Sequence, residues 1–449
     1  MSILSRSITL GLGLSVVALG FSQSAWAVPS FARQTGLACA ACHTTYPELT
    51  SFGRLFKLNG YTLTGLQQVQ SSGGGGLPEL KINEIPPFSA MFQTSVSHMN
   101  KALPPSATGK SQNNNVEFPQ QMSFFFAGEM SPHMGSFIQF TYDHQQDHFS
   151  IDNTDIRYAN QAMGGDLIYG FDMNNNPSVE DPWQSTPAWG FPFASSDLTQ
   201  GPVAPLVDGT FAQQVAGLGA YAMWNNLIYG DFTLYRSEQQ GATQPYLVGP
   251  GANSIISGVA PYWRLALQHN FGNNYLEIGT YGMAADMTPP SGVTLYSGHD
   301  KYLDLALDAQ YERNFGEDNL VVRTTYIHEK QSLDASQAGG LASNSSNTLN
   351  TFRINGTYHL GDKSGLSLGY FNTSGSSDAT LYSPANGFAG NPDTRGYIVQ
   401  ATYLPWQNIQ FGVQYTGYTK FNGASSNYDG AGRNASDNNL LYVYGWFMW

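Results

Sequence analysis

The amino-acid sequence predicts an all-β fold, a transmembrane β-barrel of about sixteen antiparallel strands that follows a small α-helical segment. The first observation is composition: only 11% of the 449 residues are charged, against about 25% in soluble proteins, yet the mean hydropathy is −0.26. The second is an apolar pattern of period 2 that recurs from residue 88 onward. The third is an alternation of short and long connections, which is typical of outer-membrane barrels.

The composition also excludes other classes of protein. The 26 Tyr, 26 Phe and 8 Trp residues are too many for a disordered chain. No run of about 20 apolar residues is present, which argues against a polytopic helical membrane protein. The formal net charge of −13 argues against a nucleic-acid partner. Few charges with many aromatic, glycine and uncharged polar residues are expected of a barrel that contacts a lipid bilayer outside and water inside.

Residues 1–27 are expected to be a signal peptide that directs export. Arg6 supplies the positive charge, residues 8–21 are an apolar stretch too short to span a membrane, and Ala25-Trp26-Ala27 forms a cleavage site. A membrane anchor is the alternative, but no stop-transfer pattern follows. The mature chain would begin near Val28, with 18 basic and 32 acidic residues and therefore a net charge of −14.

The two cysteines carry the clearest chemical signal. Cys39, Cys42 and the adjacent His43 form a C-x-x-C-H motif, the attachment signature of a c-type haem. Two thiols at this spacing can add to the two vinyl groups of one porphyrin, and the histidine becomes the proximal iron ligand. We therefore expect residues 28–71 to be a monohaem cytochrome c segment with one haem c. The alternatives are a disulfide, a zinc site lacking a fourth nearby ligand, and a thioredoxin-like motif without its βαβ context.

One short helix is expected after this motif. Thr45 and Glu48 have the spacing of a capping box, and Gly60 is a suitable end. Leu49, Phe52 and Phe56 would share one face of the helix, which would pack on the haem or on another apolar surface such as the barrel wall.

The distal iron ligand is not evident from the sequence. No Met or His lies between His43 and Met91. The nearest candidates in the chain are Met91, His98 and Met99. The alternatives are Lys57, a tyrosine, or an iron that is five-coordinate or bound to water.

A Gly/Pro linker is expected over residues 72–87, and the porin-like barrel over residues 88–449. In the segment 302–312, Leu303, Leu305 and Leu307 alternate with acidic or small residues, so one face would meet lipid and the other the lumen. The expected strands lie near 88–98, 120–130, 135–144, 152–160, 164–172, 212–224, 227–236, 260–270, 274–284, 301–313, 319–330, 349–360, 365–374, 394–404, 408–419 and 439–449.

The long connections are expected on the outer side of the bacterial outer membrane, and the largest of them covers about residues 173–211. An even number of strands places both termini in the periplasm. The C-terminal residues Leu441, Val443, Phe447 and Trp449 resemble the recognition signal of outer-membrane barrels. A sixteen-strand lumen is wide enough for the haem segment to plug it. A soluble β-sandwich is the alternative fold.

Three stretches of the N-terminal segment resemble a known family. They are residues 31–36 (Phe-Ala-Arg-Gln-Thr-Gly), the motif at 39–43, and residues 47–61 (Pro-x-Leu-Thr-x-Phe-Gly-Arg-x-Phe-Lys-Leu-Asn-Gly-Tyr). In these stretches the chain resembles the fused cytochrome–porins of iron-oxidising bacteria, in which a monohaem cytochrome precedes an outer-membrane barrel. The barrel is similar to that family in architecture and length only.

The resemblance implies an Fe(II) oxidase. Extracellular Fe(II) would be the electron donor, and the haem would pass electrons to a periplasmic carrier such as a soluble cytochrome c. By this resemblance, Cys39 and Cys42 would attach the haem and His43 would bind its iron. One-electron transfer needs no catalytic acid, base or nucleophile, so no catalytic residue is expected.

Carboxylates on the lumen face are candidates for attracting Fe(II), although such carboxylates are also ordinary in porins. The residues expected to point inward are Asp304, Asp308, Glu312, Glu277 and Glu329. Two other functions remain open at this point. One is a haem-plugged porin or channel for solute or ion transport, and the other is an extracellular reductase that sends electrons outward.

Overall fold

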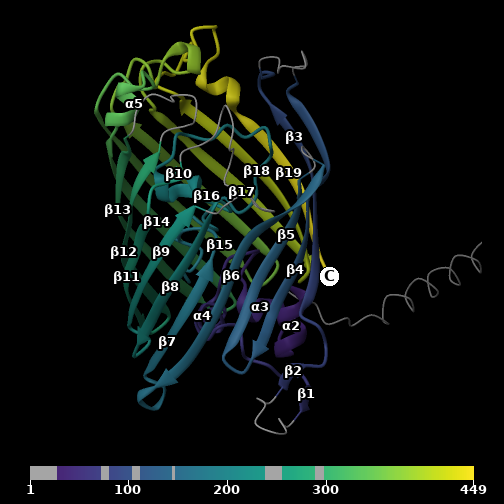
Figure 1. Ribbon diagram of the computed structural model, residues 1–449. Helices are drawn as coiled ribbons and strands as arrows, with labels where there is room; N and C mark the ends of the chain where they lie inside the picture. Colours follow the sequence, from purple (N-terminus) through teal and green to yellow (C-terminus); the bar gives the residue numbers. More distant parts are fainter. Residues whose placement is uncertain (1–27, 72–79, 104–111, 144–146, 238–254, 289–297) are drawn as a thin grey trace, which may run out of the picture.

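The computed structural model describes residues 28–71, 80–103, 112–143, 147–237, 255–288 and 298–449 (Figure 1). The expected signal peptide, residues 1–27, lies outside the described residues.

Sixteen antiparallel strands form a closed barrel, and the predicted number and approximate positions are confirmed. A further two-residue strand, β10 (Ile255–Ile256), pairs with the end of β12. The barrel strands are β3 (Phe88–Met99), β4 (Asn114–Ser131), β5 (Met134–Asp143), β6 (His148–Ala162), β7 (Leu167–Asn174), β8 (Val215–Trp224), β9 (Ile228–Ser237), β11 (Ala260–Phe271), β12 (Asn274–Thr288), β13 (Asp300–Phe315), β14 (Asp318–Ser332), β15 (Ser346–Leu360), β16 (Ser364–Gly375), β17 (Thr394–Trp406), β18 (Ile409–Lys420) and β19 (Leu440–Met448).

The first and last barrel strands close the sheet. β19 pairs with β3 in a continuous antiparallel register, in which Val443 lies opposite Val96 and Met448 opposite Met91. The amide of Ala90 also donates to the carbonyl of Trp449 at 2.9 Å. Because each strand pairs with a neighbour on both sides, the barrel has no open edge of unpaired backbone groups.

Side chains alternate between the two faces of the barrel as the period-2 pattern predicts. On β13, Leu305 and Leu307 are 48% and 62% exposed on the outer face, whereas Asp304 and Asp308 are buried on the inner face. The outer face is therefore an apolar surface suited to lipid, and the polar groups gather inside. Within the described residues no helix is both long and apolar enough to cross a membrane.

The connection between β7 and β8 does not lie outside the barrel. The prediction of a long outer loop over 173–211 is wrong for most of this segment, because residues 175–214 run through the barrel interior. Trp183 is only 1% exposed, and Asp181 forms an ion pair with the inward-facing Arg264 of β11 at 3.0 Å. We call residues 175–214 the internal loop.

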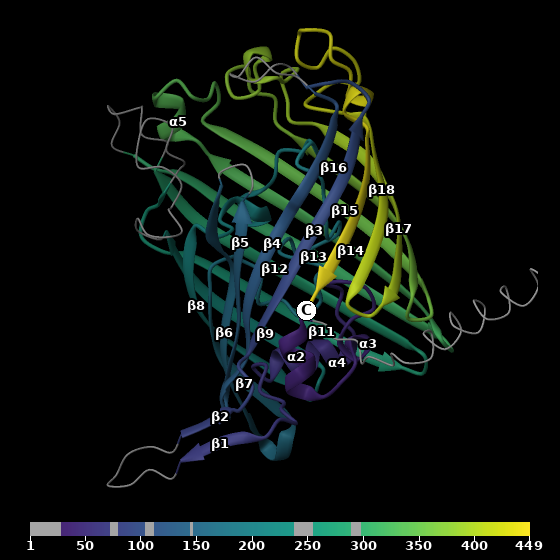
Figure 2. The ribbon, with the colours of Figure 1, turned by 90° about the vertical axis from the view of Figure 1, so that its right-hand side faces the viewer.

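Three short helices precede the barrel: α2 (Pro29–Thr35), α3 (Cys39–Cys42) and α4 (Ser51–Leu58). Both ribbon views show them at the barrel end where the chain terminates (Figures 1 and 2). The amide of Cys39 donates to the side chain of Gln407, which lies in the short turn between β17 and β18. The helices therefore lie at the end of the barrel that carries the short turns.

The expected helix start at Thr45 is wrong. The N-cap of α4 is Thr50, whose hydroxyl accepts from the amide of Gly53 at 3.2 Å. Glu48 forms no capping box, because its carboxylate binds Arg323 and His359 of the barrel wall. The predicted end is close to the observed one, since Gly60 follows α4 with a φ of 67°.

Part of the range 72–87 that was expected as a linker is a strand. β2 (Leu80–Asn83) pairs antiparallel with β1 (Gln68–Ser71), and Figure 2 shows these two strands projecting from the barrel end that holds the helices. The remaining connections contain the short helical elements η1 (Met163–Gly165), η2 (Leu206–Thr210), α5 (Asp334–Ala338), η3 (Pro384–Asn386) and η4 (Ala435–Asn438).

Candidate functional site

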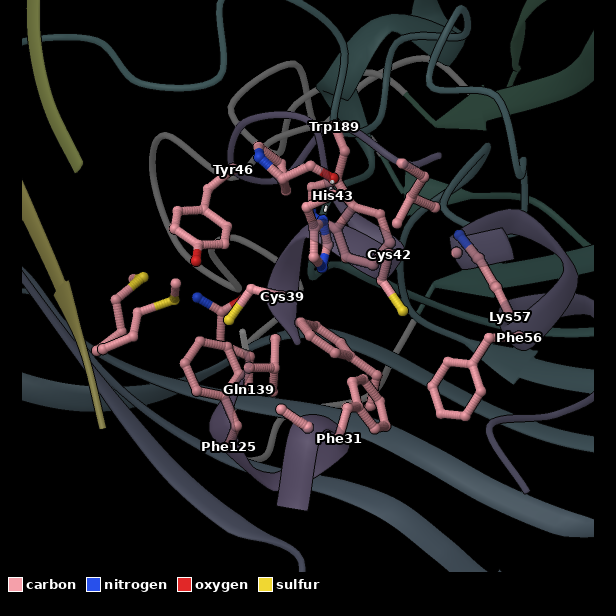
Figure 3. A pocket seen from close by; sticks show the side chains of 18 of the residues that line it. Phe31, Cys39, Cys42, His43, Tyr46, Phe56, Lys57, Phe125, Gln139 and Trp189 are labelled. Carbon is pink, nitrogen blue, oxygen red and sulfur yellow. Dashed lines mark hydrogen bonds between the residues drawn. The ribbon is translucent and has the colours of Figure 1, made fainter. Parts of the chain in front are cut away.

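The C-x-x-C-H motif lies on the wall of a cavity of about 300 Å³. Figure 3 shows the imidazole of His43 between the side chains of Cys39 and Cys42, with Phe31 and Phe125 below them. Both thiols are free. The helices, the internal loop and the barrel wall all contribute to the lining, which is mostly apolar. It further includes Tyr46, Phe56, Lys57, Tyr61, Met91, Phe137, Gln139, Gln184, Trp189, Phe193, Trp446 and Met448.

Backbone contacts fix the motif helix against α4. The carbonyl of Cys42 accepts from the amide of Thr50 at 2.9 Å, and the hydroxyl of Thr50 donates to the carbonyl of Ala41 at 2.6 Å. A Cβ on Gly53 would lie 2.3 Å from the Cys42 carbonyl oxygen, so the two helices approach at a distance that only glycine permits.

His43 is held in the tautomer that a metal ligand requires. Its Nδ1 lies 3.2 Å from the carbonyl oxygen of Pro47, and because a carbonyl can only accept, Nδ1 carries the proton. Nε2 is then left with its lone pair free. Burial lowers the pKa of His43 to about 4, so the ring is neutral at physiological pH. A neutral imidazole oriented by a backbone carbonyl is the usual form of a metal-binding histidine.

The cysteines are also uncharged. Burial raises the pKa of Cys39 to about 12 and that of Cys42 to about 11. Both side chains are therefore thiols at neutral pH. Among the described residues, no three or more His, Cys, Asp or Glu side chains are grouped so as to hold a metal ion.

Ion pairs join the helices to inward-facing residues of the barrel. The buried carboxylate of Glu48 binds Arg323 of β14 and lies 2.7 Å from Nε2 of His359 of β15. Burial alone would raise the pKa of Glu48, but Arg323 and His359 outweigh it and hold this pKa well below its usual value. On α4, Arg54 pairs with Glu312 of β13 at 2.6 Å.

The internal loop closes another side of the cavity. Lys57 of α4 donates to the carbonyls of Val179 and Asp181, and its ammonium lies 4.7 Å from the ring centroid of Trp189. The side chain of Gln184 bonds to the backbone at Pro47 and Leu49. This loop was not expected to form part of the site. A signal was present, because two Trp and two Phe within residues 183–193 are unusual for a solvated outer loop.

The three candidates for a distal ligand lie in different places. Met91 is buried in the cavity wall, beside its register partner Met448. His98 is near the other end of β3, about 23 Å further along at the rise of a strand, and bonds to Asn114 at 2.7 Å. Met99 is buried there against Arg433. Neither His98 nor Met99 lines the cavity.

The five candidate carboxylates all point inward, and each has a protein partner. Asp308 and Glu277 bind Arg264 at 2.7 and 3.0 Å, and Glu312 binds Arg54. Asp304 and Glu329 accept from backbone amides of the internal loop at 2.7 and 2.5 Å. The five carboxylates therefore hold the internal loop and α4 in position. None of the five lines the cavity.

Neither a known family model nor a curated protein sequence matches the chain. Several solved outer-membrane barrels are similar over 81% of its length. Salmonella typhi OmpF in complex with daunomycin is 11% identical, with 97% of that chain covered and a TM-score of 0.47. An anion-selective porin from Comamonas acidovorans is 9% identical, with 98% covered and a TM-score of 0.47. The outer membrane channel DcaP of Acinetobacter baumannii is 9% identical, with 96% covered and a TM-score of 0.44.

Likenesses at this level carry no argument about what the chain binds or transports. The assignment of a closed, porin-like barrel rests on the strand pairing described above. A porin-like barrel is also what the alternative function, a channel for solutes, requires.

Proposed function

We propose that this chain is an outer-membrane c-type cytochrome in which one haem, attached to Cys39 and Cys42, accepts electrons from extracellular Fe(II). The observation that carries the proposal is the free Nε2 of His43, directed by Pro47 and placed between two neutral thiols on a largely apolar cavity. A haem bound there would supply a one-electron redox centre. A periplasmic carrier such as a soluble cytochrome c would receive the electrons.

The residues of the cavity fit a haem in three respects. The two thiols are free and next to the ligand histidine. The aromatic side chains of Phe31, Phe56 and Phe125 provide an apolar wall that excludes water. The buried Trp446 indole N–H has no hydrogen-bond acceptor among the described protein groups, and the buried Tyr46 hydroxyl bonds to the thiol of Cys39.

We propose further that the helical segment plugs the short-turn end of the lumen. Arg54 pairs with Glu312 of β13, and Glu48 pairs with Arg323 of β14 and His359 of β15, so the segment is connected to three consecutive barrel strands. Tyr61 adds a hydrogen bond to Asp155 of β6 at 2.6 Å. With the internal loop on its other side, the cavity would be shielded from a continuous water path through the barrel.

Fe(II) would approach from the end with long connections. The candidate lumen carboxylates are engaged by Arg264, Arg54 and the internal loop. We therefore assign attraction of the cation to the expected net charge of −14 of the mature chain as a whole rather than to one carboxylate.

The second candidate function is a channel. The closed sixteen-strand barrel with a polar interior favours it. In that case the internal loop would form a constriction, and ions would pass beside it. The two functions differ in what they require of Cys39 and Cys42, because conduction needs no covalent haem.

The deciding experiment uses the purified full-length protein. Covalent haem is measured by staining and by absorbance, and the oxidised protein is mixed with Fe(II) under anoxia. We expect the reduced α-band to appear, and we expect the Cys42→Ala variant to lose it. A stained protein that Fe(II) does not reduce contradicts iron oxidation. An unstained protein that conducts ions in planar bilayers contradicts the haem and supports the channel.

A further inference from the structure

Gln184 of the internal loop contacts the group that orients His43. Its Nε2 donates to the Pro47 carbonyl oxygen at 3.0 Å, and this oxygen also accepts from Nδ1 of His43 at 3.2 Å. Its Oε1 accepts from the amide of Leu49 at 2.8 Å. The amide orientation is therefore determined, since Leu49 N–H can only donate and Pro47 C=O can only accept.

The position of Gln184 is itself fixed by the barrel. The side chain is 3% exposed. Nε of Arg323 donates to the carbonyl of Trp183 at 3.0 Å, and Nη1 of the same arginine binds Glu48. One guanidinium of β14 thus holds both the internal loop and the segment that follows His43.

Sharing one carbonyl between two donors affects the ligand. A histidine that donates a strong Nδ1–H bond gains electron density on Nε2 and becomes a more basic metal ligand. Gln184 competes for the same oxygen and weakens that bond. A less basic imidazole stabilises oxidised iron less, so the second donor would raise the midpoint potential of the site.

We propose that Gln184 is a positioning residue that sets the ligand strength of His43 through the Pro47 carbonyl. The internal loop would then help to set the midpoint potential of the site, although Gln184 lies 135 positions after Leu49 in the chain. The inference rests on the proposed haem function and adds a residue to it.

The test is a spectroelectrochemical titration of full-length protein with covalently attached haem. In the Gln184→Met variant, a side chain of similar length without an N–H donor, we expect the midpoint potential to fall. The matched control is Gln200→Met in the same loop, because its Nε2 bonds only to the Leu198 carbonyl and does not reach Pro47. We expect the control to keep the wild-type potential.

An unchanged or raised potential in Gln184→Met overturns the inference, as does an equal fall in the Gln200→Met control. If Gln184→Met does not fold, Gln184→Leu serves instead, because it also removes the donor to Pro47 and adds no charge; the same fall is expected, and its absence overturns the inference. A wild-type protein that binds no haem refutes the proposed function and is recognised before any titration.

Discussion

Gly53 is the residue at which the smallest change is expected to disturb the proposed haem site. A Cβ would lie 2.3 Å from the Cys42 carbonyl oxygen and 3.1 Å from its carbon, both of which are backbone atoms. We predict that Gly53→Ala pushes α3 away from α4 at a cost of about 1–3 kcal/mol and lowers the yield of covalent haem. The measurement is the haem absorbance divided by the amount of folded barrel protein.

Gly356 on β15 provides the control for Gly53→Ala. A Cβ there would have its nearest neighbour at 3.5 Å, an ordinary contact, so Gly356→Ala should leave the haem yield unchanged. Equal yields in wild type and Gly53→Ala would show that the close approach of the two helices is not needed for attachment.

Glu48 is expected to hold the N-terminal helices on the barrel wall through its ion pair with Arg323. In Glu48→Gln, the guanidinium of Arg323 would stay buried without its countercharge, which costs about 3–5 kcal/mol when one partner of a buried pair is removed. The N-terminal helices should then be cleaved faster by protease than in wild type. Glu84→Gln is the control, because Glu84 is exposed on the chain that leads to β3. Similar cleavage rates in both variants would refute a docking role for Glu48.

The roles of single residues could be predicted from the sequence only where the residues that act together are neighbours in the chain. Cys39, Cys42 and His43 were predicted as a haem site because haem attachment requires a fixed spacing. The structure places all three on one cavity, and the haem itself stays a prediction. Glu48 was assigned to a capping box because its neighbours allow one, but its partner Arg323 is 275 positions away. A pattern of adjacent residues carries no information about such a partner.

At the scale of elements, the strands followed from sequence and the internal loop did not. A barrel strand can be recognised from its own residues, because apolar side chains face lipid and polar side chains face the lumen at alternate positions. The path of residues 175–214 depends instead on which lumen groups they meet, above all Arg264. Length alone suggested an outer loop.

Arg264 is the group on which the internal loop depends most. It binds Asp181 of the loop together with Glu277 and Asp308 of the wall, and all four side chains are fully buried. We predict that Arg264→Met leaves these carboxylates unpaired, loosens the loop and increases ion conductance in planar bilayers. Arg353→Met is the matched variant, because Arg353 also pairs with the loop, at Asp208.

The expected difference between these variants follows from solvent access. The Arg353 side chain is 27% exposed, so water can compensate for its loss, and the conductance should change less than in Arg264→Met. A larger effect at Arg353 would mean that the internal loop is held mainly near η2 and not at the buried cluster.

Considered as a whole, the molecule separates its barrel from the helical segment that carries the C-x-x-C-H motif. Every barrel strand pairs with other barrel strands, and no described strand pairing connects the barrel to residues 28–71. The helical segment is attached through side chains and turns, such as Glu48 with Arg323 and Cys39 with Gln407. The barrel should therefore fold without the segment, whereas the cavity needs both.

Deletion of residues 28–66 tests this division. We predict a barrel that still shows heat-modifiable migration in gels, contains no haem, and conducts little, because the internal loop keeps its own bonds to Arg264, Asp304 and Glu329. Combining the deletion with Arg264→Met should give a much larger conductance than either change alone, since both obstructions are then removed. Full conductance after the deletion alone would show that the helical segment, and not the internal loop, closes the lumen.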